Sequence, residues 1–197
     1  MKPKKVSAFW AWFSSISDEL AANVEEKAVL EELDKKVREL HPGLSWEIGP
    51  GRTREWQLVI SPNLDRELRS LARAIVAQAP VLPEWQFYAA RRPKDWNYQF
   101  QIGTEGGHLR NLDASRWKFV LLEYPDETQE ILLQASDAIS LREDERWQAA
   151  AIVLESILGE DMVLDRIGEF ELVGELEPQF AADARPIQEL RDVLLTT

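Results

Sequence analysis

Two short stretches in which apolar and polar residues alternate constrain the fold of this chain more than any other feature of its sequence. Large apolar residues occupy every second position of residues 44–48 (LSWEI) and again of residues 56–60 (WQLVI). A period of two places these side chains on one face of a β-strand. Residues 49–54 between them begin with Gly-Pro-Gly, which favours a turn. We therefore predict a β-hairpin with one face that other elements must bury.

Helical segments flank this hairpin. Residues 17–40 carry apolar side chains at spacings of three and four, and Ser17 can cap the N-terminus of such a helix. A second helix is predicted between Pro62, which suits the first helical position, and Pro80, which cannot continue a helix. A third strand is predicted at residues 85–89. This order of elements indicates an α+β fold, with helices packed on one face of a mainly antiparallel sheet.

The rest of the chain carries a less regular version of the same pattern. Strands are predicted at residues 98–102, 117–122, 131–133 and 170–173. A loop is predicted at 103–116 and a turn at 125–127. Helices are predicted from a capping box at residues 140–143 to Gly159, and from Pro186 to about Leu194. The buried stripe of the first of these two helices includes Trp147.

The length of 197 residues suits a single domain, because a chain of this size buries roughly 70% of the surface that it exposes when unfolded. A polar break at residues 91–97 would divide the chain into two parts of similar size, 1–90 and 98–197. We predict one α+β domain over residues 1–197, with this break as the place where a subdivision would fall.

The net charge of −12 is concentrated toward the C-terminus. Residues 1–125 hold 18 Lys and Arg against 17 Asp and Glu, whereas residues 126–197 hold 5 against 18. An acidic C-terminal third repels the phosphates of nucleic acids and is complementary to a basic protein partner. The alternative explanation is that this charge serves solubility alone.

Other features of the sequence bear on the cellular compartment. The chain has no cysteine, which fits a reducing environment and excludes a disulfide scaffold and a thiol nucleophile. Its apolar runs are far shorter than the ~20 residues of a membrane span. Residues 9–13 lack the aliphatic core of a signal peptide, and we interpret them as an aromatic anchor for the first segment. We predict a cytoplasmic protein without a membrane partner, and the sequence does not indicate an oligomeric state.

Four stretches together carry a resemblance. They are residues 9–13 (FWAWF), 58–63 (LVISPN), 79–87 (APVLPEWQF), and 154–160 (LESILGE) with 166–168 (RIG). On these stretches the chain resembles a set of uncharacterised bacterial proteins of unknown function. None of the stretches is a catalytic motif, and each is typical of fold chemistry such as a turn or a helix end. The resemblance implies an α+β fold in a bacterial cytosolic protein, and it implies no activity.

The sequence contains few residues suited to a catalytic or metal site. The two histidines are His41 and His108, and a zinc site needs three or four ligands. Glu105 and His108 lie three residues apart in a glycine-rich stretch that is not expected to be helical, so we predict no metal and no cofactor. This stretch also lacks the glycine spacing of nucleotide-binding loops. A hydrolase that uses His108 with carboxylates such as Glu105 is kept as an alternative.

The preferred binding region is residues 91–98 (RRPKDWNY), where cationic and aromatic side chains interleave in a predicted loop. Such a mixture can pair with an anion and stack on a base or on an acidic peptide. The alternative is an ordinary turn, with Trp96 packed under the core and the charges facing water. With the neighbouring glycine-rich stretch included, the candidate binding residues are Arg91, Arg92, Trp96, Tyr98, Glu105 and His108.

These observations favour a noncatalytic protein-interaction or regulatory module, such as an inhibitor or adaptor, whose acidic C-terminal third binds a basic partner. The alternatives are the hydrolase that uses His108 and a small-molecule sensor with an aromatic cleft near Trp96 and Tyr98.

Overall fold

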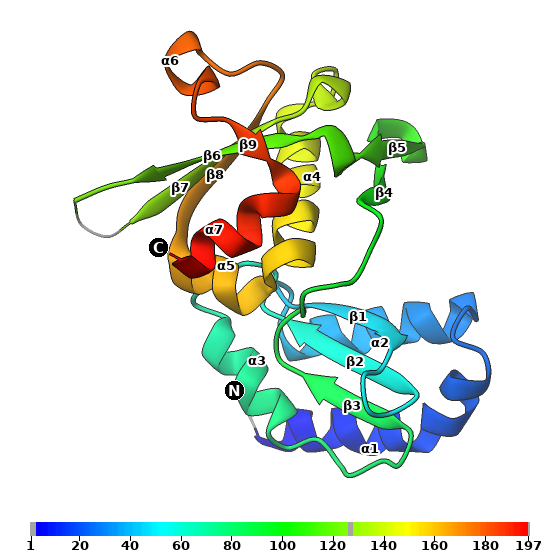
Figure 1. Cartoon of the computed structure of the whole chain (residues 1–197). Coiled ribbons are helices and arrows are strands. Elements are labelled where there is room, and N and C mark those ends of the chain that lie inside the picture. The colour runs from blue at the N-terminus through cyan, green and yellow to red at the C-terminus, as the bar shows by residue number, and fades with distance from the viewer. Residues whose placement is uncertain (1–2, 126–127, 197) are drawn as a thin grey trace. The chain divides into compact units, whose positions relative to one another are not determined.

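The computed structural model describes residues 3–125 and 128–196 (Figure 1). The chain forms two compact units, unit 1 (Met1–Arg91) and unit 2 (Arg92–Thr197). Both units combine helices with strands, and most strand pairs are antiparallel. The predicted α+β class is therefore confirmed.

Unit 1 has one three-stranded sheet and three helices within the described residues. In chain order they are α1 (Pro3–Ala22), α2 (Lys27–Leu40), β1 (Ser45–Pro50), β2 (Trp56–Ser61), α3 (Arg69–Val76) and β3 (Trp85–Tyr88). β1 and β2 form the predicted antiparallel hairpin, in which Trp46 lies opposite Ile60 and Ile48 lies opposite Leu58. β3 pairs with β2 in the parallel direction.

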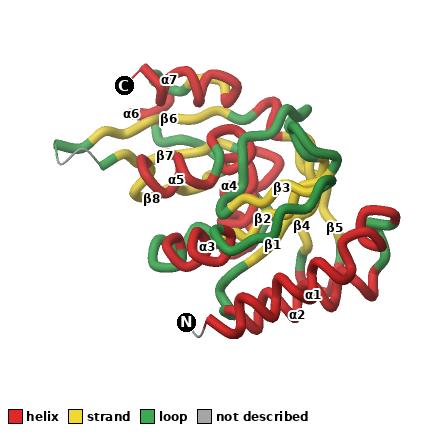
Figure 2. Tube along the Cα trace, turned by 90° about the horizontal axis from the view of Figure 1, so that it is seen from below, coloured by secondary structure: helices red, strands yellow, loops and turns green. Residues whose placement is uncertain are grey.

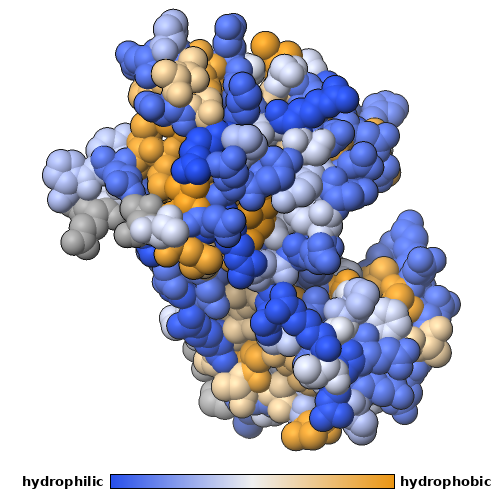
Figure 3. Space-filling model, in the orientation of Figure 1, coloured by the Kyte–Doolittle hydropathy of each residue, from blue (hydrophilic) through white to orange (hydrophobic). Residues whose placement is uncertain are grey.

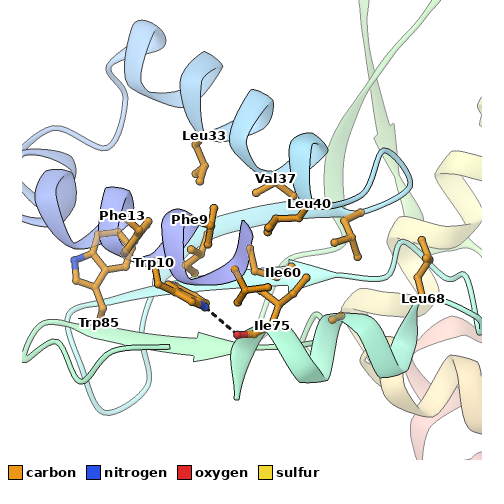
Figure 4. Close-up of a cluster of buried hydrophobic side chains, with 14 of the residues drawn as sticks. Phe9, Trp10, Phe13, Leu33, Val37, Leu40, Ile60, Leu68, Ile75 and Trp85 are labelled. Atoms are coloured by element: carbon orange, nitrogen blue, oxygen red, sulfur yellow. Dashed lines mark hydrogen bonds between the residues drawn. The ribbon is translucent and has the colours of Figure 1, made fainter. Parts of the chain in front are cut away.

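The helices of unit 1 bury their apolar side chains against one face of this sheet. Figure 4 shows Phe9 and Trp10 of α1, Val37 of α2 and Ile75 of α3 gathered around Ile60 of β2. The alternating stretches thus supply one wall of the core and the helices supply the other.

The first predicted helix is wrong in its extent. α1 already begins at Pro3, the chain turns at residues 23–26, and α2 begins at Lys27. Ser17 caps no helix, because it is buried inside α1 and its hydroxyl donates to the carbonyl of Ser14. The aromatic run, which the sequence predicts to be an anchor only, follows helical spacing and extends the helix toward the N-terminus.

The anchor itself is confirmed by its burial. Phe9, Trp10 and Phe13 are almost fully buried, and Trp10 Nε1 donates to the carbonyl of Ile75 at 2.9 Å. This bond satisfies the indole N–H, which would be costly to bury alone.

The second predicted helix begins later than expected. Pro62 is followed by Asn63 and Leu64 with φ angles of 57° and 60°, which lie in the left-handed region and interrupt a right-handed helix. The backbone N–H of Asn63 donates to the hydroxyl of Ser61, which holds this turn in place. α3 therefore starts only at Arg69.

Unit 2 holds the remaining elements. They are β4 (Gln99–Gly103), β5 (Leu109–Asp113), β6 (Lys118–Glu123), β7 (Gln129–Gln134), α4 (Glu143–Leu158), α5 (Glu160–Arg166), β8 (Ile167–Val173), α6 (Pro178–Ala181), β9 (Arg185–Pro186) and α7 (Leu190–Thr196). β4 and β5 form a separate hairpin, and the four-stranded sheet has the order β8-β7-β6-β9. α4, α5 and α7 lie beside this larger sheet (Figures 1 and 2).

Three predictions for unit 2 need correction. The loop expected at 103–116 contains β5, which pairs with β4. α4 begins at Glu143, and the carboxylate of Glu145, not a serine at the cap, accepts the N–H of Arg142 at 2.9 Å. Trp147 was predicted to be buried, but 49% of it is exposed, because the alanines and leucines of the opposite face of α4 fill the core.

Other expectations for unit 2 have clearer outcomes. The strands at 117–122 and 131–133 are confirmed as β6 and β7, with Phe119 opposite Leu133. The turn predicted at 125–127 lies partly outside the described residues, since 126 and 127 are not among them. None of the helices in the described ranges combines the length and apolarity required to cross a bilayer.

Candidate functional site

Four of the candidate residues lie on or beside the β4–β5 hairpin of unit 2. Trp96 and Tyr98 precede β4, whereas Glu105 and His108 lie in the tip between the two strands. Gly106 and Gly107 in that tip have φ angles of 81° and 76°, a conformation that glycine adopts without steric cost. The glycine-rich stretch is therefore a hairpin turn.

The N-terminus of α4 fixes the tip of this hairpin. The guanidinium of Arg142 lies 2.6 Å from the carboxylate of Glu105 and 2.7 Å from that of Asp144. The buried carboxylate of Glu145 accepts backbone N–H bonds from both Arg142 and Glu105, at 2.9 and 3.1 Å. The hydrogen bond from Arg142 lowers the pKa of Asp144. Glu105 thus has a structural partner.

Neither a hydrogen bond nor an ion pair joins the imidazole of His108 to these described acids. His108 is exposed, and within the described residues its imidazole has no hydrogen-bond partner. The same part of the chain contains no group of three His, Cys, Asp or Glu side chains placed to hold a metal ion. The structure therefore does not bring Glu105 and His108 together as an acid–base pair.

Trp96 and Tyr98 belong to an aromatic cluster. Their ring centroids are 5.2 Å apart, and Phe100 lies 6.0 Å from both Trp96 and the buried Trp117. Tyr98 has a φ of 64°, which is uncommon for a bulky residue and places its backbone in the left-handed region. Trp96 is half-buried, so the cluster reaches from the core of unit 2 to its surface.

A polar groove of about 600 Å³ runs along the same hairpin. It is lined by Gln99, Phe100, Gln101, Asn111, Leu112, Asp113 and Asp137. Asp137 accepts hydrogen bonds from Trp117 Nε1 at 2.9 Å and from the N–H of Asp113 at 3.2 Å. Hydrogen bonds from Ser115 hold the carboxylate of Asp113 and lower its pKa. Protein donors therefore hold the carboxylates of both Asp113 and Asp137 in place.

The two candidate arginines belong to different units. Arg91 ends unit 1, where its guanidinium donates to the hydroxyl of Ser45 at 2.7 Å and lies 4.0 Å from the carboxylate of Glu47. Arg92 begins unit 2 and is half-buried. The predicted loop of interleaved charges and aromatics is thus divided between two separately packed parts of the chain.

The negative charge of the protein resides in unit 2. Residues 1–91 hold 13 Lys and Arg and 13 Asp and Glu, whereas residues 92–197 hold 10 and 22. Unit 1 is therefore neutral, and unit 2 carries the whole net charge of −12. Hydrophilic residues cover much of the visible surface in Figure 3.

Part of this charge lies on β8, an edge strand of the larger sheet. Glu169 and Glu171 are exposed, and Glu130 of β7 lies directly opposite Glu169. The hydroxyl of Tyr124 donates to Glu130 at 2.6 Å, and this bond raises the pKa of Tyr124. These carboxylates share one face of the sheet because side chains alternate along each strand.

On the other face of the sheet, the half-buried Phe170 of β8 pairs with the exposed Trp147 of α4. Phe170 stacks on Trp147 of α4, with the ring centroids 5.7 Å apart. We call the set Glu130, Glu169, Glu171, Trp147 and Phe170 the acidic edge. None of these residues is among the candidates predicted from the sequence, although alternating glutamates at 169 and 171 are themselves a sign of a strand with one acidic face.

No protein-family model, no curated protein and no solved structure matches the chain. The resemblance to uncharacterised bacterial proteins stays a prediction.

Proposed function

We propose that unit 2 is a noncatalytic protein-interaction module whose acidic edge binds a basic segment of a partner protein. The observation that carries this proposal is the placement of the charge: unit 1 is neutral, and unmatched carboxylates gather on an edge strand of unit 2. The same charge disfavours a nucleic-acid partner.

The arrangement of carboxylates in the acidic edge lowers the stability of the folded protein. Glu130 and Glu169 face each other across neighbouring strands, and like charges in that position are destabilising. Within the described residues, none of the carboxylates of Glu130, Glu169 and Glu171 forms a salt bridge. A bound cationic segment would relieve this repulsion, so the local electrostatics favour a basic ligand.

Trp147 gives the same surface an anchoring point. Exposed tryptophans at protein interfaces often contribute a large share of the binding energy, and the indole face attracts a guanidinium. Glu143 precedes Trp147 by four residues, so it lies beside Trp147 on the surface of α4. An arginine stacked on Trp147 would therefore have a carboxylate within reach.

An extended partner fits the edge strand. A strand added beside β8 would direct alternate side chains to its two faces, one lined by glutamates and the other by Trp147 and Phe170. We expect the preferred segment to alternate basic and apolar residues. The competing explanation is that the glutamates only prevent edge-to-edge association of sheets.

The test is a matched pair of charge reversals in the full chain. E169K/E171K alters the acidic edge, and E25K/E32K makes the same change in net charge on exposed residues of unit 1. The probe is a synthetic nine-residue peptide of alternating arginine and valine, measured by fluorescence anisotropy at low and high salt.

We expect the wild-type chain to bind this peptide, with weaker binding at high salt. E169K/E171K should lose affinity at least about tenfold, whereas E25K/E32K should stay within about twofold of wild type. Equal losses in both variants would show that only net charge matters. Absence of binding by the wild type would support the explanation of edge protection and overturn the proposal.

The polar groove favours a second candidate function, a small-molecule sensor near Trp96 and Tyr98. Its support is the unusual backbone of Tyr98 together with the groove that begins at Gln99. Ligand-dependent tryptophan fluorescence across a metabolite panel, compared between wild type and Trp96→Phe, tests it. Signals that are flat at millimolar ligand, or unchanged by the substitution, count against it.

A further inference from the structure

Unit 1 contains a hollow between α1 and α2. It has a volume of about 260 Å³ and is lined by Lys5, Ala8, Phe9, Lys36, Glu39 and Leu40. Phe9 and Leu40 are almost fully buried and supply the apolar floor of this lining. The hollow therefore combines an apolar base with a rim of long charged side chains.

The two lysines at the rim are held in place without an acidic partner. Lys5 Nζ donates to the carbonyl of Glu39 at 3.0 Å, which uses one of its three protons. Lys36 Nζ lies 5.8 Å from the ring centroid of Trp12, within the range of a cation–π contact. Neither ammonium forms a salt bridge in the described part of the chain, although Asp and Glu outnumber Lys and Arg by 35 to 23.

We propose that this hollow binds a small monocarboxylate with an apolar body. The floor of Phe9, Ala8 and Leu40 would receive the body, and the ammonium groups of Lys5 and Lys36 would receive the carboxylate. Two lysines against one glutamate give the lining a net positive charge, which disfavours a cationic ligand. Because the volume lies just below the lower limit of about 300 Å³ for drug-sized ligands, the ligand is a small one.

This site lies wholly within unit 1 and does not depend on the acidic edge. The test uses the full chain and two probes of equal chain length, the anion octanoate and its neutral analogue octanamide. Binding is measured by isothermal titration calorimetry and by chemical-shift changes of the tryptophan indole N–H groups, since Trp12 lies beside Lys36.

The matched variants remove equal charge at lining and non-lining positions. K5M/K36M removes the two rim ammonium groups while keeping apolar stems, and K4M/K35M removes two exposed lysines that do not line the hollow. Thermal melts of both variants show whether each remains folded.

We expect octanoate to bind the wild type at least about fivefold more tightly than octanamide. The reason is that only the carboxylate of octanoate can pair with the two lysine ammonium groups, and each exposed pair contributes little. K5M/K36M should lower octanoate affinity about tenfold and leave octanamide unchanged, while K4M/K35M should match wild type. Equal affinity of the wild type for both probes, or no binding of octanoate, would overturn the proposal even if K5M/K36M failed to fold.

A hydrophobic C-terminal residue of a peptide presents the same chemistry as a fatty acid. Acetyl-leucyl-leucine with a free carboxylate is therefore the third probe. Tighter binding of this dipeptide than of octanoate would assign the site to peptide C-termini, and the reverse order would assign it to free acids.

Discussion

Asp34 of α2 accepts hydrogen bonds from two different elements. Its carboxylate lies 2.7 Å from Arg38 Nε in the same helix and 3.2 Å from Trp46 Nε1 of β1. These bonds, chiefly the one from Arg38, lower the pKa of Asp34. A depressed pKa means that the folded state prefers the ionised form more strongly than the unfolded chain does.

Asp34→Asn should therefore lower the stability of the protein at neutral pH. The side chain is partly exposed, so the loss should be below about 1 kcal/mol. This contribution is present above the unfolded pKa of about 3.9 and disappears as the pH falls through the lower folded pKa. Urea unfolding of wild type and variant should show a smaller difference near pH 3 than at pH 7.

Glu32→Gln, a change at an exposed carboxylate of the same helix, is the control for this measurement. It should leave unfolding at pH 7 within about 0.5 kcal/mol of wild type. A gap between wild type and Asp34→Asn that is as large near pH 3 as at pH 7 would show that packing, not ionisation, explains the loss.

At the scale of elements, the junction of α4 and α5 depends on one glycine. Gly159 has a φ of 83°, and a Cβ built on it would lie 2.7 Å from Cδ of Pro93. An alanine here would suffer both backbone strain and a collision with a rigid ring. The segment that begins unit 2 therefore packs against this junction.

Gly159→Ala should destabilise the protein by about 1–3 kcal/mol, the usual cost of such a strained backbone. Gly103→Ala is the matched control, because a Cβ at Gly103 meets no atom within 4 Å and its φ is not positive. Thermal unfolding of both variants measures the contrast. Similar melting temperatures for the two variants would contradict the role given to Gly159.

The elements also show where sequence reasoning reaches its limit. The hairpin of β1 and β2 was predicted correctly because alternation and turn chemistry act within a dozen residues. β5 was missed because its residues Leu109–Asp113 are mostly polar, and only its pairing with β4 makes it a strand. The same limit applies to Trp147, whose exposure depends on which side of α4 meets the sheet.

At the scale of the whole molecule, unit 1 has a hydrophobic core of its own. The buried cluster that joins α1, α2 and α3 to the sheet draws its residues from positions 6–89 only. A fragment of about ninety residues with such a core is long enough to fold without disulfides or metals.

A fragment of residues 1–91 should therefore fold by itself, with a cooperative thermal transition followed by circular dichroism. A shorter fragment, residues 1–79, lacks Trp85, whose indole N–H donates to the carbonyl of Ser17 at 3.3 Å from a buried position. We expect this shorter fragment to remain unfolded. A fragment 1–91 that folds only after residues 92–197 are added would contradict the prediction.

Some features of the candidate site can be read from the sequence, and others depend on the tertiary structure. The excess of acidic residues toward the C-terminus can be counted from the sequence, as can the interleaved residues 91–98. Neither count indicates that Arg91 and Arg92 fall in different units, or that Glu130 and Glu169, far apart in the chain, face each other.

The sequence by itself determined the α+β class, the first hairpin and the burial of the aromatic anchor, because each follows from the period of apolar residues within a short window. Only the tertiary structure decided the parallel pairing of β3 and β8, the exposed face of α4 and the hollow between α1 and α2. These features arise where segments distant in sequence meet, and a local pattern does not specify which distant strand or helix will pack against a given face.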